Sequence, residues 1–261
     1  MTLSNRKILR TLLCLLAGTL YAVCLSACDA KEPLSENRDA EIESPVIAND
    51  LSNQKVTAIA EDTQGHIWIG TFRGLNKNNV HDYHQYFCTD DSLGLPDNQI
   101  THLLRDSKNR FWVGTVNGVC LYTDKDNFRI IPIEADNKNV RQILEDRNGR
   151  IFLNTGFQLY AYHPREEKIT CVLPEISPGN AFYAQCHIAP DNNLWVMTST
   201  GLRCYDPSTL QLKESVALSG YPYYSYLHNN ELWITGNHTL SIFDTGFQLY
   251  AYHPREEKIT C

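Results

Sequence analysis

The hydrophobic and polar residues after residue 50 follow one pattern that recurs along the chain at spacings of 44, 40, 43 and 38 residues. Each copy contains a run of strand-forming residues, a short polar turn and a second run around an aromatic residue, as in HIWIGTFRGL and RFWVGTVNGV. No segment after residue 50 has the 3.6-residue period of a helix. The aromatic anchors of the five copies are Trp68, Trp112, Phe152, Trp195 and Trp233.

The turn before each anchor strand has its own sequence signature. Gly or Asn stands three residues before every anchor, and both residues tolerate the positive φ that a tight hairpin turn requires. The pattern therefore predicts a β-hairpin in each copy. The residues at this position are Gly65, Asn109, Gly149, Asn192 and Asn230.

Short strands joined by hairpins at a nearly fixed period predict an all-β fold, a β-propeller of about five four-stranded blades over residues 51–261. One blade cannot bury its own face, so we expect each anchor to pack between neighbouring sheets, where its burial contributes about 2–3 kcal/mol. Three acidic residues lie beside the hairpins. We expect Asp62, Asp106 and Asp146 to cap these turns rather than to bind a metal.

The second copy carries a resemblance to a known family. Residues 94–122, GLPDNQITHLLRDSKNRFWVGTVNGVCLY, closely resemble the two-component regulator propeller repeat, which combines a Leu-Pro turn, a strand ending in Asp, a hairpin, Trp-[Ile/Val]-Gly-Thr and Gly-Leu. The first copy matches from Val56 to Leu75, and the last three copies keep fewer of these positions. The resemblance implies the periplasmic sensor region of a hybrid histidine kinase of the Bacteroidetes type, often a sensor of oligosaccharides. The chain shows no phospho-acceptor His box and no Gly-rich ATP lid.

The first 28 residues have the layout of a secretory signal, with a basic start followed by an apolar run. Their last four residues, LSAC, resemble a bacterial lipobox, which makes Cys28 the expected lipidation site. An uncleaved membrane anchor is the alternative interpretation. Both interpretations predict a periplasmic, membrane-tethered protein in which residues 29–50 form a flexible tether.

The C-terminal residues 245–261 repeat residues 155–171 without a single change, whereas other copies agree only at framework positions. A recent duplication with truncation and an error in the assembled sequence both account for this identity. The copied stretch could serve as an outer strand of the fifth blade. We therefore expect an incomplete or truncated propeller, and both an open and a closed ring are compatible with the sequence.

Composition and motif content argue against several classes of function. The net charge of −7 argues against nucleic-acid binding, which needs clustered Lys and Arg. The nine cysteines contain no CxxC pair, and the histidines lack metal-ligand spacing, so neither a metal nor a cofactor is expected. No G-x-S-x-G motif is present. We therefore expect a chain that is not an enzyme.

The candidate ligand-binding residues lie in loops. The loop after the anchor strand carries a polar residue five positions past the anchor in four copies, and the segment YPYYSYLH supplies tyrosines. These side chains suit an oligosaccharide or a carboxylated sugar through hydrogen bonds and ring stacking. Taken one at a time, each is more simply an ordinary solvated loop residue. The candidates are Arg73, Asn117, Thr200, His238, Tyr221 and Tyr223.

Two other functions remain open. Five-bladed propellers include glycoside hydrolases and lyases, which need two or three carboxylates at the channel, and here Asp97 is the sole close candidate. A protein-interaction lipoprotein shares all of these features and differs from a sensor only in what the chain is joined to. A homodimer is compatible with each function.

Overall fold

A computed structural model describes residues 45–261 except 90–93, 124, 177–183, 219–221, 229–230, 237–238, 245–247, 254–257 and 261. The described residues form five antiparallel sheets and no helix. None of them, accordingly, builds a helix of the length and apolar character needed to cross a membrane. The expected signal segment 1–28, with Cys28, and most of the expected tether lie outside the described residues.

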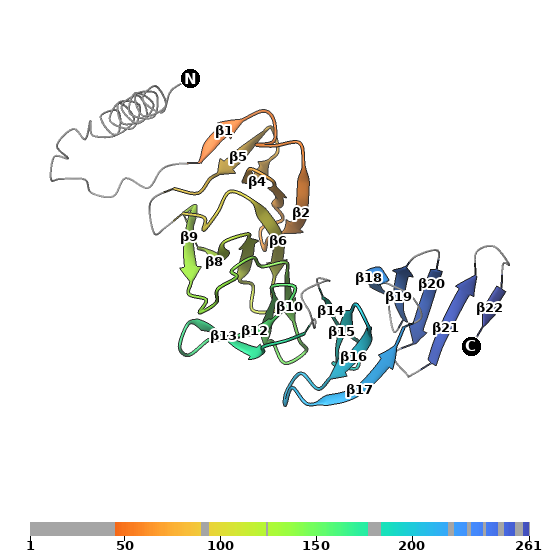
Figure 1. The fold of residues 1–261 in the computed structure, drawn as a ribbon. Helices are drawn as coiled ribbons and strands as arrows, with labels where there is room; N and C mark the ends of the chain where they lie inside the picture. The colour runs from red at the N-terminus through yellow and green to blue at the C-terminus, as the bar shows by residue number, and fades with distance from the viewer. Residues whose placement is uncertain are drawn as a thin grey trace, which may run out of the picture. The chain divides into compact units, whose positions relative to one another are not determined.

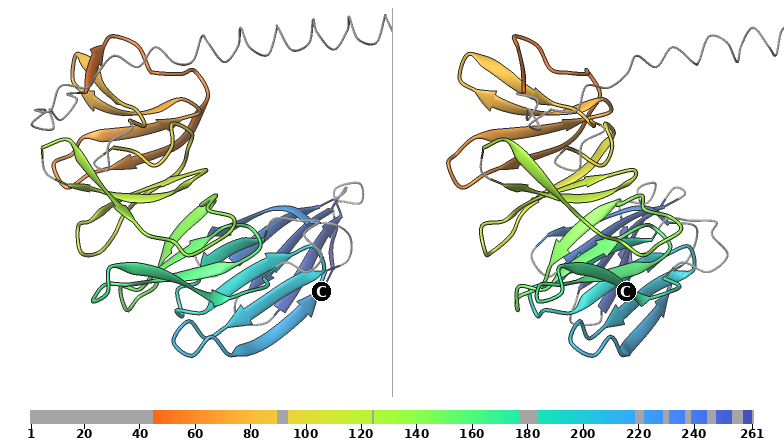
Figure 2. Two further views of the ribbon diagram at one scale, coloured as in Figure 1. Left: turned by 60° about the vertical axis from the view of Figure 1, so that its left-hand side comes forward. Right: turned by 90° about the vertical axis from the view of Figure 1, so that its left-hand side faces the viewer.

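The sheets follow one another in chain order (Figures 1 and 2), and each is called a blade here. Strands run in sequence order across each blade, except that β1 joins the outer edge of the first blade beside β5. The blades are β1 (Val46–Ala48), β2 (Val56–Glu61), β3 (Ile67–Thr71), β4 (Gly74–Asn79) and β5 (Asp82–Tyr86); β6 (Ile100–Arg105), β7 (Phe111–Thr115), β8 (Gly118–Thr123) and β9 (Asn127–Ile131); β10 (Gln142–Glu145), β11 (Ile151–Asn154), β12 (Leu159–His163) and β13 (Lys168–Leu173); β14 (Gln185–Ile188), β15 (Leu194–Thr198), β16 (Gly201–Tyr205) and β17 (Leu212–Ala217); and β18 (Pro222–His228), β19 (Glu231–Gly236), β20 (Thr239–Asp244), β21 (Gln248–His253) and β22 (Lys258–Thr260).

This arrangement confirms the predicted all-β propeller of five blades. Three blades have the expected four strands, whereas the first and the last have five. The extra strand of the last blade comes from the C-terminal copy, because residues 245–261 contain β21 and β22. The identical residues 155–171 form β12 and part of β13 in the third blade.

The hairpin turns confirm the role predicted for Gly and Asn. Asn109 and Asn192 adopt φ values of 62° and 70°, and Gly65 and Gly149 adopt 83° and 73°. Asn230 lies outside the described residues. Positive φ at these positions bends the chain directly from the first strand of a blade into its anchor strand.

The aspartates beside the turns act as predicted. Asp62 Oδ1 accepts hydrogen bonds from the backbone N–H groups of Gln64 (2.8 Å) and His66 (3.0 Å), and Asp106 and Asp146 repeat this arrangement. Each of these carboxylates therefore caps its own turn.

Four of the five anchors are buried between blades, as expected. Trp68, Trp112 and Trp195 are 0% exposed and Phe152 is 1% exposed. Each lies in an apolar cluster with the next blade, so that Trp68, for example, packs with Phe111 and Val113. Trp233, in the last blade, differs from the other anchors and is only half-buried.

Candidate functional site

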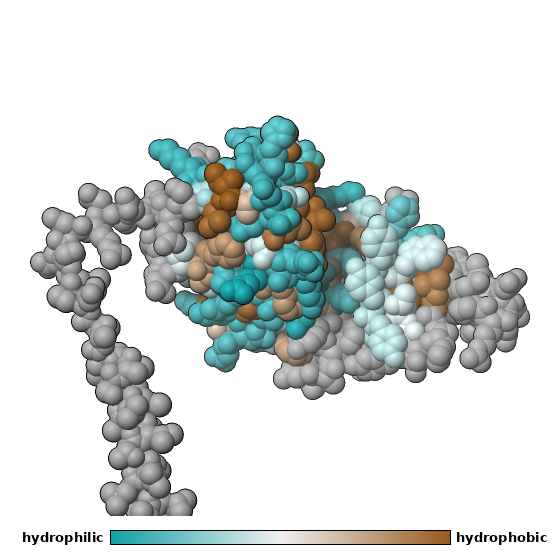
Figure 3. Space-filling view, turned by 90° about the horizontal axis from the view of Figure 1, so that it is seen from above, coloured by the Kyte–Doolittle hydropathy of each residue, from teal (hydrophilic) through white to brown (hydrophobic). Residues whose placement is uncertain are grey.

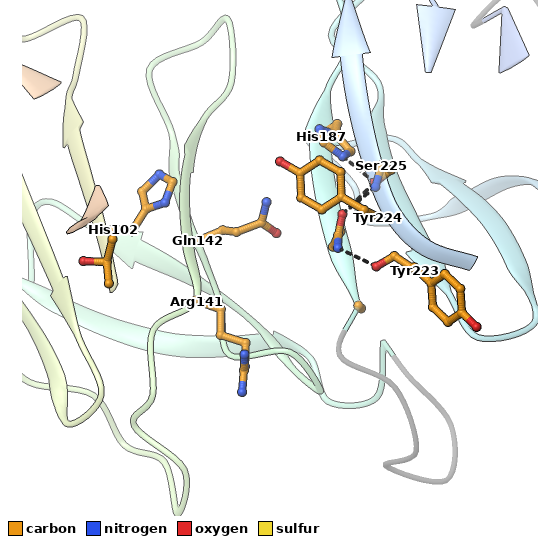
Figure 4. Close-up of a pocket in the computed structure, with 10 residues that line it drawn as sticks. His102, Arg141, Gln142, His187, Tyr223, Tyr224 and Ser225 are labelled. Carbon is orange, nitrogen blue, oxygen red and sulfur yellow. Dashed lines mark hydrogen bonds between the residues drawn. The ribbon is translucent and has the colours of Figure 1, made fainter. Parts of the chain in front are cut away.

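A cavity of about 580 Å³ lies where the first strands of the five blades converge. Its volume falls within the range typical of small-molecule sites. Every blade contributes at least one side chain, and Figure 4 shows the third-blade and fifth-blade residues on opposite walls. The lining residues are Thr57, His102, Arg141, Gln142, Ala184, Gln185, His187, Tyr223, Tyr224 and Ser225.

Side chains on these first strands bond each blade to the next one. Thr57 Oγ1 in the first blade donates to the backbone oxygen of Ile100 in the second blade, at 2.8 Å. Thr101 Oγ1 in the second blade donates in the same way to the oxygen of Val140, at the start of the third blade. The wall of the cavity is therefore continuous across these blades.

Glutamines continue the same connection through the later blades. The Gln142 side chain exchanges two hydrogen bonds with the backbone of Cys186, accepting from its N–H at 2.9 Å and donating to its oxygen at 3.3 Å. The Gln185 oxygen accepts from the N–H and the hydroxyl of Ser225, at 2.8 and 3.0 Å. Both amides thus serve the wall itself as well as lining the cavity.

Two histidines face the cavity in their neutral form. Burial lowers the pKa of His187 to about 4, and its Nε2 lies 2.8 Å from Ser225 Oγ. Burial also lowers the pKa of His102, although a hydrogen bond to the Ile143 backbone partly offsets the effect. At neutral pH both rings can therefore exchange hydrogen bonds without carrying charge.

Arg141 gives the cavity its charge. It is the one lining residue with a permanent charge, and none of the ten residues that line this described cavity is Asp or Glu. The formal charge of the lining residues is therefore positive, whereas the chain as a whole carries −7. Tyr223 and Tyr224 complete the wall and keep 56% and 60% of their surface exposed, which leaves ring faces accessible.

One of the predicted ligand-binding residues, Tyr223, lines the cavity. Arg73, Asn117 and Thr200 occupy equivalent exposed positions in the hairpin after the anchor strand, outside the cavity lining. Their backbone N–H groups donate to the hydroxyl of the Thr two residues earlier, at 3.1, 3.2 and 3.3 Å. His238 and Tyr221 lie outside the described residues. Of the six predicted ligand-binding residues, Tyr223 is therefore the one that the described structure places in the cavity lining.

Most cavity residues were missed by the sequence reasoning, which considered loops before strands. A signal was present, since polar residues stand ten positions before the anchor in the second, third and fourth copies. These residues, His102, Gln142 and Gln185, all line the cavity. A polar residue that recurs at one position of the first strand is expected where these strands face a solvent-accessible cavity at the centre of the propeller.

The described residues contain no group of His, Cys, Asp or Glu that could hold a metal. Cys120, Cys186 and Cys204 are buried in the strands as free thiols, and burial raises the pKa of each. Buried thiols of this kind pack as small hydrophobic side chains.

A family model described as the two component regulator propeller matches residues 50–73 and 94–117. These two segments are two component regulator propeller repeats. The sequence-based resemblance to this family is thereby confirmed for the first and second blades, while the other three blades lie outside the match. No curated protein matches the chain.

Solved structures share the fold at low identity. The extracellular domain of a one component system from B. thetaiotaomicron is 16% identical, with a TM-score of 0.61 over 79% of this chain and 35% of that domain. Virginiamycin B lyase from Staphylococcus aureus is 17% identical, with a TM-score of 0.61 over 81% of this chain and 75% of the lyase. These identities establish the propeller fold alone. The chain spans about a third of the length of the B. thetaiotaomicron domain.

Proposed function

We propose that this chain is an extracytoplasmic sensor propeller of a two-component system, which binds an acidic oligosaccharide in the cavity formed by the first strands. The propeller repeats at residues 50–73 and 94–117 support the sensor assignment. The observation that carries the ligand class is the cavity lining, which combines Arg141, exposed tyrosine rings and neutral hydrogen-bonding side chains.

The chemistry of the lining fits such a ligand. A guanidinium group can bind a carboxylate through two parallel hydrogen bonds. Tyr223 and Tyr224 offer ring faces for stacking against a sugar ring, while Gln142 and the two histidines can bond to hydroxyl groups. Because the chain covers about a third of the similar extracellular domain, we assign signal output to protein regions beyond this propeller.

We assign the chain a binding role and no catalysis. Glycoside hydrolysis commonly needs a pair of carboxyl groups, and the cavity lining contains none. Asp97, the earlier candidate, accepts a hydrogen bond from the backbone N–H of Gln99 at 2.8 Å and is absent from the lining.

A propeller lyase is the second candidate function. His102 and His187 both line the cavity and are neutral, and a neutral imidazole can act as a general base. The two functions differ in their products. If the full chain converts an acidic oligosaccharide to an unsaturated product, and His187→Gln abolishes that conversion, the lyase replaces the sensor as the assignment.

Calorimetry with the full chain tests the binding proposal. Acidic oligosaccharides, such as oligogalacturonides, should bind, whereas neutral oligosaccharides of equal length should bind at least about tenfold more weakly because they lack the partner for Arg141. Arg141→Gln should remove this preference, and Tyr223→Ala should weaken both ligand classes.

Arg73→Gln is the matched control, because it removes an equal charge from an exposed turn outside the cavity. Binding that is insensitive to Arg141→Gln but lost with Arg73→Gln would move the site to the hairpin loops. Absence of binding across both ligand classes would refute the acidic oligosaccharide.

A further inference from the structure

A contact between the fourth and fifth blades fixes where a cavity histidine carries its hydrogen. His187 Nε2 lies 2.8 Å from the hydroxyl oxygen of Ser225 (Figure 4). A neutral imidazole carries a hydrogen on only one of its two nitrogens, and that choice decides which nitrogen donates and which accepts. The surroundings of Ser225 make the choice here.

The side chain of Gln185 sets the direction of the Ser225 hydroxyl. The backbone N–H of Ser225 points at Gln185 at 2.8 Å, so the amide must turn its oxygen, and not its NH₂ group, toward Ser225. The Ser225 hydroxyl lies 3.0 Å from the same oxygen and donates its one hydrogen to it. The NH₂ group of Gln185 donates instead to the backbone oxygen of Tyr223, at 3.3 Å.

The Ser225 hydroxyl therefore has lone pairs but no hydrogen left for His187, so Nε2 must be the donor in their contact. The reverse arrangement would leave the oxygens of Ser225 and Gln185 3.0 Å apart with no hydrogen between them. Because burial keeps the ring of His187 neutral near pH 7, the hydrogen on Nε2 is the only one on the ring nitrogens. Nδ1 consequently carries a lone pair and acts as an acceptor.

The accepting nitrogen of His187 is open to the cavity. Nδ1 has no hydrogen-bond partner among the residues that the structure describes, and it is not one of the polar atoms that are shut off from solvent there without a partner. His187 lines the cavity, so a ligand can reach this atom. The oxygens of Gln142 and Gln185 differ from it, because each already accepts two hydrogen bonds from the protein.

A fixed acceptor inside a cavity can select a ligand in a way that a solvated group cannot. Hydrophilic residues cover much of the face shown in Figure 3, so groups that can bond to a sugar hydroxyl are common on the surface, where water competes for them. In the cavity, Arg141 can only donate and Nδ1 of neutral His187 can only accept. A ligand that satisfies both must offer an acceptor to one and a hydrogen to the other.

We propose that Ser225 and Gln185 are positioning residues, which hold the hydrogen of His187 on Nε2 so that Nδ1 accepts a hydrogen bond from a hydroxyl group of the ligand. The hydroxyl contact rests on the acidic oligosaccharide proposed above. The position of the hydrogen, in contrast, is a property of the chain without ligand and can be measured separately. Together with Arg141, this contact selects a sugar acid that has a free hydroxyl.

Nitrogen NMR of the full chain with ¹⁵N-labelled histidine tests the positioning, because protonated and bare imidazole nitrogens have widely separated shifts. The signals of His187 are those lost in His187→Gln. Near neutral pH, Nε2 should show the shift of an N–H nitrogen and Nδ1 that of a bare one. Ser225→Ala, which keeps the backbone bond to Gln185, should move both shifts toward those of free histidine. Ser225→Thr keeps the hydroxyl and should leave them in place.

Calorimetry with trigalacturonate tests the hydroxyl contact through two substitutions of one residue. In His187→Gln the amide reaches the place of Nε2 and can keep the bond to Ser225, but no acceptor remains at the place of Nδ1. The affinity should therefore fall about tenfold. In His187→Asn the shorter side chain puts an amide oxygen near the place of Nδ1, so most of the lost affinity should return. Thermal unfolding of both variants checks that each is folded.

Different results would overturn different parts of the proposal. A hydrogen on Nδ1, or a spectrum that Ser225→Ala leaves unchanged, would show that Ser225 does not position His187. Equal losses of affinity in His187→Gln and His187→Asn would exclude the hydroxyl contact at Nδ1. If the spectrum is as expected but the natural chain does not bind trigalacturonate, the proposed ligand class fails together with the hydroxyl contact, while the positioning of His187 is supported.

Discussion

The indole nitrogen of Trp68 donates a hydrogen bond to Asp62 Oδ2 at 2.9 Å. The same carboxylate caps the hairpin turn through its other oxygen, so one aspartate links the turn to the buried anchor. Trp112 repeats the bond to Asp106 at 2.8 Å. In the third blade Phe152 has no N–H group to donate. Asp146 there keeps the bond from Arg150 Nε, at 2.8 Å, which is the counterpart of the bond from Arg110 Nε to Asp106 in the second blade.

This linkage predicts a large effect of removing one carboxylate. Asp106 is 3% exposed and accepts from two backbone N–H groups, from the Trp112 indole and from Arg110. Asp106→Ala should lower the free energy of unfolding by about 2–4 kcal/mol, because it leaves several buried donors without acceptors. Urea denaturation measures the loss. Asp97→Ala, which removes one hydrogen bond to the Gln99 N–H, should cost less than about 1 kcal/mol.

The Gly of the Trp-Ile-Gly-Thr segment is predicted to be a packing requirement between blades. A Cβ atom at Gly70 would lie 2.5 Å from Cγ2 of Ile100 in the second blade, whereas one at Gly114 would lie 3.1 Å from Val140. Gly70→Ala should therefore destabilise the protein by about 1–3 kcal/mol, and Gly114→Ala by less. Thermal unfolding ranks the two variants. If Ile100→Ala fails to relieve the Gly70→Ala defect, the steric explanation is wrong.

The cavity histidines predict a loss of stability in mild acid. Burial lowers the pKa of His187 from 6.5 to about 4, so between these values the unfolded chain binds a proton that the folded chain does not. Stability should therefore rise with pH through this window and fall as pH drops from about 6.5 to about 4, by roughly 3 kcal/mol for this residue. His187→Gln should flatten the dependence, and the shift at His102 would account for what remains. An unchanged slope in the variant would contradict the assignment.

The lipobox predicts the attachment of the chain to the membrane. Cys28 lies outside the described residues, so this prediction rests on the LSAC sequence and its basic, apolar approach. In a bacterial host, the natural chain should incorporate labelled fatty acid and sediment with membranes. Cys28→Ser should abolish the labelling. Cys88→Ser is the control, because Cys88 is an exposed cysteine elsewhere in the chain.

The sequence was sufficient for the blades because their burial is periodic. Each anchor, each hairpin Gly or Asn and each capping Asp returns at a fixed place in the repeat, so the copies support one another's interpretation. Blade number, hairpin position and the burial of four anchors followed from this periodicity. The half-buried Trp233 departs from the pattern because burial of an anchor depends on the next blade, which its own repeat does not encode.

The cavity was harder to predict because its lining does not repeat. His102, Gln142 and Gln185 share one position in the repeat but not one chemistry. Irregularities at the start of the first strands, between Ile100 and His102 and between Pro222 and Tyr224, also change which side chain faces the centre. A one-residue shift reverses the faces of a strand. Alternation alone therefore could not identify Tyr224 or Ser225 as cavity residues.

The side chains of four residues on the first strands each form a hydrogen bond with the neighbouring blade: Thr57 and Thr101 donate to it, and Gln142 and Gln185 accept from it. A molecule that displaced one strand at the centre would consequently strain the adjacent strand through a side chain, and that strand would strain the one after it. Mechanical disturbance would travel around the circumference instead of outward through a single blade. The whole wall would then respond to an occupant touching only part of it.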